Sequence, residues 1–243
     1  MSEPLQVRRL LALDTATENC SVALWLDGEI AAIEREIGRG HAEQILPMVE
    51  SLLAAAQLRL ADLDALAVGR GPGGFTGVRL AISVVQGLAF GVAKPVVPVS
   101  NLRAIAQRAF DREPAASRCL VCADARMREV YRGEFLRDAA GLAVAAGSSG
   151  RSGAVDEAVL PPEVVILSPA PGLILAGRGF SASTDLRARA LATGLPLFDD
   201  LLPGAAEIAR LAVADARRGA AQPAASVRPM YLRDKVAEPP AVS

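Results

Sequence analysis

Histidine is almost absent from this chain of 243 residues, in which His41 is the only one. A catalytic Ser–His or Cys–His pair could therefore be built only around that residue. A zinc or iron site on a helix would need a second histidine at the next turn, where the chain has Ile45. The shortage argues against most hydrolytic mechanisms and against a metal site. His41 is expected at the start of a helix or in an interface.

Acidic residues are missing between Asp64 and Asp111. This gap contains a glycine-rich run, 69–79, in which Gly69, Gly71 and Gly74 have the G-x-G-x-x-G spacing of a dinucleotide site. Such a site needs an Asp or Glu about 20 residues later for the ribose, and none is present. No Lys-Ser or Lys-Thr pair follows, as a Walker-type loop requires. The run instead predicts a strand-to-helix junction approached closely by another group, with anion binding at its amides as a residual role.

Long apolar runs are also missing. Asp14 ends the short run Leu10–Leu13, and the segment 78–92 contains Arg79 and Gln86. No signal peptide or membrane span is therefore expected. The formal net charge of -1 gives no global attraction to nucleic acid or to an anionic membrane. We expect a cytoplasmic protein with one large domain or two lobes.

Cysteine is scarce, with Cys20, Cys119 and Cys122 as the set. Cys119 and Cys122 have C-x-x-C spacing but lie in an apolar segment that predicts a buried strand. Residues three apart in a strand point to opposite faces, with Cα atoms about 10 Å apart, too far for a disulfide. These residues are therefore expected to be structural thiols in a reducing compartment.

The order of the expected elements indicates an α/β fold. The first part of the chain predicts strands at 10–14, 21–26, 30–37, 63–68 and 96–99, and helices at 41–57, 76–91 and 101–110, with Thr76 as an N-cap. Three meander strands followed by alternating helices and strands are the order of an RNase H-like or actin-like lobe. We place this lobe at 1–110 and a smaller one at 111–243.

The second lobe is expected to contain strands at 118–121, 129–136, 164–167 and 173–176, and a helix at 205–218 that could pack back on the first lobe. The segment Ala139–Ala154 is rich in Ala, Gly and Ser and predicts a flexible surface excursion. The tail is expected to be ordered at Tyr231 and frayed beyond Glu238.

The helix expected at 76–91 has small residues on one face. Ser83, Gly87 and Gly91 recur at intervals of four residues. Each glycine costs about 1 kcal/mol relative to alanine in a helix, so a close approach by another surface is indicated. Packing on the chain's own sheet and a subunit interface both remain open.

Two aspartates at expected strand ends suggest a nucleotide cleft. Asp14 is followed by Thr15 and Thr17, and Asp124 begins the corresponding turn of the second lobe. Carboxylates and hydroxyls at these places suit a Mg-nucleotide. Asp and Thr are also common turn residues, so both interpretations stay open.

Several segments together resemble the bacterial TsaB family. They are Leu13–Thr17, His41–Met48, Gly69–Arg79, Asp124–Arg126 and Glu129–Tyr131. The resemblance extends over nearly the whole chain and is densest before residue 135. It implies two actin-like (ASKHA) lobes, each a mixed sheet flanked by helices.

The resemblance also implies a function. Family members are noncatalytic dimerisation subunits of the machinery that makes tRNA threonylcarbamoyladenosine. The paralogous partner TsaD transfers the threonylcarbamoyl group to N6 of the adenosine next to the anticodon in tRNAs that read codons beginning with A. TsaD holds the metal and the nucleotide intermediate, the ATPase TsaE joins the complex, and tRNA is contacted indirectly.

For this chain the resemblance implies no catalytic residue, no metal and no tightly bound cofactor, with ATP or ADP on the partner subunits. Asp14, Thr15 and Asp124 would be a weak, vestigial nucleotide site. The partner interface would use the two helices of the first lobe, which could also join two copies of the chain. The interface residues are His41, Ile45, Met48, Gly74, Thr76, Arg79, Ser83, Gly87 and Gly91.

Two alternatives remain. An independent ATP-dependent phosphotransferase of the actin and sugar-kinase fold would use Asp14 and Asp124. A metalloprotease-like glycoprotease homologue is disfavoured by the single histidine.

Overall fold

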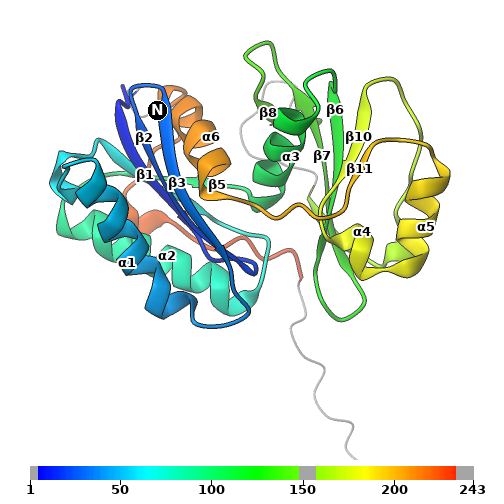
Figure 1. Cartoon of the computed structure of the whole chain (residues 1–243), viewed down its shortest axis with the longest axis horizontal. Helices are drawn as coiled ribbons and strands as arrows, with labels where there is room; N and C mark the ends of the chain where they lie inside the picture. The colour runs from blue at the N-terminus through cyan, green and yellow to red at the C-terminus, as the bar shows by residue number, and fades with distance from the viewer. Residues whose placement is uncertain (1–4, 148–156, 234–243) are drawn as a thin grey trace, which may run out of the picture.

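The computed structural model describes residues 5–147 and 157–233, which form two mixed β-sheets with helices around and between them (Figure 1). The first sheet has the strand order β3-β2-β1-β4-β5. Its strands are β1 (Arg9–Asp14), β2 (Asn19–Leu26), β3 (Glu29–Glu36), β4 (Ala65–Gly69) and β5 (Val96–Val99). The first three strands are antiparallel, and β4 and β5 run parallel to β1.

The second sheet repeats this topology in the order β11-β10-β6-β7-β8. Its strands are β6 (Arg118–Asp124), β7 (Val130–Arg137), β8 (Ala143–Ala145), β10 (Leu173–Ala176) and β11 (Leu197–Phe198). An additional strand, β9 (Ala158–Leu160), pairs with β7. Again an antiparallel meander is joined by two parallel strands. The predicted fold class, two actin-like lobes, is confirmed.

The two faces of the first sheet differ in the size of the side chains that they carry. In β1, Leu11 and Leu13 face the core beneath α1 (His41–Ala55) and α2 (Phe75–Gly91). Ala12 and the alanines of β2 and β4 face α6 (Ala205–Arg217) instead. Alternate residues of a strand point to opposite faces, so the α6 side is richer in alanine, although Leu10 of β1 also packs there. The small face lets α6, itself rich in alanine, lie close to the sheet.

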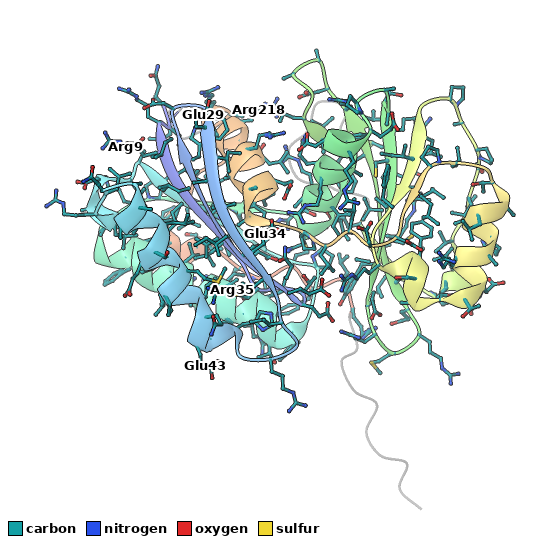
Figure 2. The ribbon with its side chains drawn as sticks, in the orientation of Figure 1. Arg9, Glu29, Glu34, Arg35, Glu43 and Arg218 are labelled. Carbon is teal, nitrogen blue, oxygen red and sulfur yellow. The ribbon has the colours of Figure 1, made fainter. Side chains whose placement is uncertain are left out.

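The two central helices connect the lobes. α3 (Asn101–Arg112) follows the first sheet in the chain but packs on β6, β7 and β8, whereas α6 follows the second sheet and packs on β1 and β2. Figure 1 shows both helices between the sheets, where they contact each other. Arg108 of α3 pairs with Glu34 of β3, labelled in Figure 2, and with Glu207 of α6. Both lobes therefore share one core.

Shorter elements complete the fold. They are α4 (Gly179–Ala182), α5 (Thr184–Ala192) and the 3-10 turns η1 (Leu60–Asp62), η2 (Pro162–Val164) and η3 (Ala224–Ser226). Among the helices that the structure describes, none combines the length and the apolar character needed to cross a membrane.

Three local predictions were wrong. Thr76 is not the N-cap of α2, because the helix begins at Phe75 and Gly74 is the cap. No strand forms at 164–167, because prolines precede the segment and the Arg189 side chain, instead of a neighbouring strand, binds the carbonyl of Val165. The flexible excursion predicted for Ala139–Ala154 is wrong at its start, because this part contains strand β8. The rest of that prediction, within 148–156, and the predicted fraying beyond Glu238 lie outside the described residues.

The prediction of structural, unpaired thiols is confirmed, whereas the reducing compartment stays a prediction. All three thiols are free and buried. Cys119 packs in the core shared by the lobes and Cys122 packs on the opposite side of the second sheet. Burial raises the pKa of the Cys122 thiol to about 12, so it stays protonated at neutral pH.

Candidate functional site

The glycine run packs against the chain's own β1–β2 turn. A Cβ added to Gly69 would lie 2.0 Å from Asp14 Oδ1, and one added to Gly77 would lie 2.0 Å from the Thr15 carbonyl oxygen. Gly74 N donates to the Ala16 carbonyl over 2.7 Å. The close approach predicted from these glycines is therefore intramolecular, and it fixes where α2 begins.

A buried hydrogen-bond network joins three segments at this point. Asn101 Nδ2 donates to Asp14 Oδ1 over 2.8 Å, and Asn101 Oδ1 accepts from Gly71 N over 2.7 Å. The backbone N–H of Asn101 also donates to the Gly71 carbonyl. Burial raises the pKa of Asp14 to about 7, although Asn101 and the Ala16 amide oppose that rise by donating to the carboxyl group. Asn101 was not predicted from sequence, because nothing in its local pattern separates it from an ordinary helix-start asparagine.

A cavity of about 830 Å³ lies between the lobes, and both contribute to its lining. Thr15 and Asp124 line it, whereas Asp14 does not. The Thr15 hydroxyl donates to the Gly77 carbonyl over 2.7 Å. The structure thus brings two of the three predicted nucleotide-site residues to one cavity and turns the third, Asp14, toward Asn101.

Asp124 is already paired within the β6–β7 turn. Its Oδ1 accepts from Arg126 N over 2.7 Å, and its Oδ2 lies 3.1 Å from the Arg126 guanidinium. Arg126 also pairs with Glu18 of the first lobe. In the described parts of the chain, no three His, Cys, Asp or Glu side chains are grouped so that they could hold a metal ion.

The predicted interface residues of α1 have structural roles. His41 Nε2 lies 2.9 Å from the Thr17 carbonyl oxygen, which ties the first residue of the helix to the β1–β2 turn. Ile45 and Met48 are 0% and 1% exposed and pack in the core of the first lobe. They hold α1 on the sheet, so their side chains are not on the surface where we expected them. Glu43, labelled in Figure 2, is exposed on the same helix.

The predicted interface residues of α2 do form an exposed face. Gly74, Thr76, Arg79, Ser83, Gly87 and Gly91 are all exposed. Among the residues that the structure describes, none would lie within 4 Å of a Cβ added to Gly87 or Gly91, so the sheet does not require these two glycines. Phe90 is 85% exposed beside them, and Leu46 of α1 is 43% exposed. This face of α2 combines bare backbone with an uncovered aromatic side chain.

Phe75, Arg79 and Tyr231 form an exposed cluster at the first turn of α2. The Arg79 guanidinium carbon lies 3.5 Å from the Phe75 ring centroid, and Arg79 Nε donates to the Tyr231 hydroxyl over 2.7 Å. Neither Phe75 nor Phe90 was among the predicted site residues. The chain has only 4% aromatic residues, so two phenylalanines in α2 could have marked this helix as a candidate binding surface.

The fold and site define a class of protein, two actin-like lobes around a cavity whose predicted nucleotide residues are engaged by internal contacts. The family model described as TsaD: tRNA N6-adenosine threonylcarbamoyltransferase matches residues 33–173. A relative from Escherichia coli (strain K12), the tRNA threonylcarbamoyladenosine biosynthesis protein TsaB, is 42% identical, with 94% of this chain and 96% of the relative covered. A TsaB of Haemophilus influenzae is 38% identical, with 96% of each chain covered. The chain belongs to the TsaB family.

Solved structures agree with this assignment. The crystal structure of an uncharacterized Pseudomonas aeruginosa protein with similarity to peptidase YEAZ has a TM-score of 0.80 at 43% identity. It covers 93% of this chain and 99% of its own. A structure of YeaZ from the same organism has a TM-score of 0.79 at 43% identity and covers 92% of this chain and 99% of its own.

Proposed function

We propose that this chain is a noncatalytic subunit in the biosynthesis of tRNA threonylcarbamoyladenosine. In this proposal it binds a TsaD-type partner, and the partner transfers the threonylcarbamoyl group to N6 of the adenosine next to the anticodon. The observation that carries the proposal is the exposed face of α2, where no other described residue approaches the positions of Gly87 and Gly91.

The state of the cavity supports a noncatalytic role. Asp14 is buried against Asn101, and Asp124 is paired with Arg126. His41 is committed to a backbone contact at the start of α1. We therefore place the metal and ATP or ADP on the partner subunits, with a TsaE-type ATPase joining the complex and tRNA contacted through it. The proposed setting is the cytoplasm.

The shape of α2 favours a helical partner surface. Glycine brings a facing helix close to the backbone, and the exposed aromatic Phe90 resembles the anchors that dominate interface energies. Burying such a face would remove apolar surface from water, which contributes about 25 cal/mol of binding free energy per Å² of buried apolar area. The same face would be available to a second copy of the chain when the partner is absent.

The test is association of the purified chain with its TsaD-type partner, measured by light scattering. Gly87→Arg should weaken the heterodimer at least about tenfold, which corresponds to about 1.4 kcal/mol. The graded control, Gly87→Ala, adds one methyl group that the described residues leave room for but that a closely facing partner would meet, so it should weaken the heterodimer less than Gly87→Arg does. Unchanged association of the arginine variant would contradict the proposed surface. Absence of association by the wild-type chain would contradict the subunit role.

A further inference from the structure

Residues 227–233, called the strap here, run from the first lobe to the second (Figure 1, red). The strap begins at Val227, which is 1% exposed and packs in the core beneath α1 and α2. Gln86 Nε2 of α2 donates to the Val227 carbonyl over 3.2 Å and to the Ala224 carbonyl over 3.0 Å. This end of the strap is therefore fixed to the first lobe.

The middle of the strap lies on the start of α2. Met230 N donates to the Arg70 carbonyl over 2.8 Å. The ring centroids of Tyr231 and Phe75 lie 5.9 Å apart, and the Arg79 guanidinium carbon is 5.5 Å from the Tyr231 centroid. Together with the Arg79–Tyr231 hydrogen bond, these contacts form a cation–aromatic cluster that holds the middle of the strap on α2.

The far end of the strap holds the β6–β7 turn of the second lobe. Arg233 pairs with Glu129 and donates to the Ala125 carbonyl over 3.3 Å. Within the turn, Arg126, Met127 and Arg128 have φ angles of 60°, 53° and 60°. The left-handed region is unfavourable for non-glycine residues, so a turn with three of them in a row depends on contacts that hold it.

The β6–β7 turn also reaches back to the first lobe, because Arg126 pairs with Glu18. Residues of the turn and of the strap line the cavity between the lobes, including Arg126, Tyr231 and Arg233. The ties between the lobes at this cavity thus include the Arg126–Glu18 pair and the strap, and also the pair between Arg178, which lines the cavity, and Glu36 of β3.

We propose that the strap couples the first turn of α2 to the β6–β7 turn, so that disturbing either end loosens the other. The coupling is a property of the chain alone. Its consequence for assembly rests on the proposed function: a partner that displaces Tyr231 from Arg79 would release Arg233 from Glu129 and free the turn. Binding of a partner at α2 would then change the mobility of the β6–β7 turn in the second lobe.

Hydrogen exchange measured by mass spectrometry on the full chain tests this coupling from both ends. Tyr231→Ala should speed exchange of the 125–131 amides about tenfold, equivalent to about 1.4 kcal/mol of lost protection. Because coupling is reciprocal, Arg233→Ala should speed exchange of the 78–80 amides of α2. Tyr231→Phe, which keeps the ring but loses the hydroxyl contact with Arg79, should give an intermediate effect at 125–131.

The matched control is Arg228→Ala. Arg228 is exposed on the strap and donates to the nearby Ala225 and Val227 carbonyls, so both distant segments should keep their wild-type rates. Exchange in β4 and α3 monitors whether each variant remains folded. Faster exchange confined to the strap in Tyr231→Ala and Tyr231→Phe, with 125–131 unchanged, would overturn the proposal. The proposal would also be overturned if Arg233→Ala sped exchange only near residue 233 and left the exchange rates of the 78–80 amides unchanged.

Discussion

Asp14 has no exposed surface, and its neighbours explain how an acidic side chain is tolerated there. Asn101 Nδ2 and Ala16 N donate to its two carboxyl oxygens. Burial is nevertheless the larger effect and raises its pKa from 3.8 to about 7. A carboxyl group in this state holds the turn that receives α2, and it is not presented to the cavity between the lobes.

The raised pKa predicts how stability depends on pH. Between about pH 4 and pH 7 the folded chain binds a proton at Asp14 that the unfolded chain has lost. This contribution is therefore fully present below the unfolded pKa and is lost as pH rises toward 7, by at most about 1.4 kcal/mol per pH unit. Asp14→Asn removes the titration, so the free energy of unfolding should decline less over this window. Urea unfolding at half-unit pH steps measures it, and parallel wild-type and variant curves would contradict the assignment.

Sequence alone placed Asp14 correctly at the end of a buried strand but did not determine its role. Its hydrogen-bond donor Asn101 lies 87 positions away in the chain. Ile45 and Met48 show the same limit, because helical spacing identifies a helix face but does not say whether a sheet or a partner covers it. The structure assigns both residues to the core.

At the scale of elements, α2 contains two kinds of glycine. Gly77 is required internally, because a Cβ there would lie 2.0 Å from the Thr15 carbonyl oxygen. Gly87 faces open space on the same helix. The first kind positions the helix, whereas the second leaves its backbone uncovered.

These environments predict opposite effects of the same substitution. Gly87→Ala should stabilise the isolated chain by about 0.5–1 kcal/mol, because alanine is the better helix former. Gly77→Ala should destabilise it by about 1–3 kcal/mol through overpacking against the β1–β2 turn. Denaturant unfolding of the two variants provides the comparison. Equal effects would show that the two sites are not distinguished by their surroundings.

Sequence patterns predicted most elements of the first lobe, since its helices and strands have clear apolar periodicity. They failed where the partner of a backbone group is distant. At 164–167 the apolar pattern is strand-like, but the Val165 carbonyl is bound by the Arg189 side chain. At the start of α2 the cap is Gly74, whose amide is held by Ala16, a contact that no local pattern encodes.

At the scale of the whole molecule, two lobes of equal topology enclose a cavity while α3 and α6 join them. Residues at the positions expected for nucleotide binding are present but engaged. Asp14 is turned away, and Asp124 is paired with Arg126. The actin-like architecture is thus present while these two carboxylates make internal contacts.

This arrangement predicts weak nucleotide binding by the isolated chain. Calorimetry with Mg-ATP should give a dissociation constant above about 100 µM, which is roughly 5.5 kcal/mol of binding free energy. Tighter binding that is lost in Asp14→Ala would instead favour an independent phosphotransferase. Asp124→Asn provides a comparison at the residue that does line the cavity.

A role in tRNA modification that depends on the exposed face of α2 can be measured in cells. Threonylcarbamoyladenosine is quantified by nucleoside mass spectrometry of tRNA from cells depleted of the chain and complemented with variants. Depletion should lower this nucleoside, the wild-type chain should restore it, and Gly87→Ala should restore more of it than Gly87→Arg at equal abundance. Normal threonylcarbamoyladenosine in depleted cells, or full restoration by Gly87→Arg, would show that the chain does not act through this helix face.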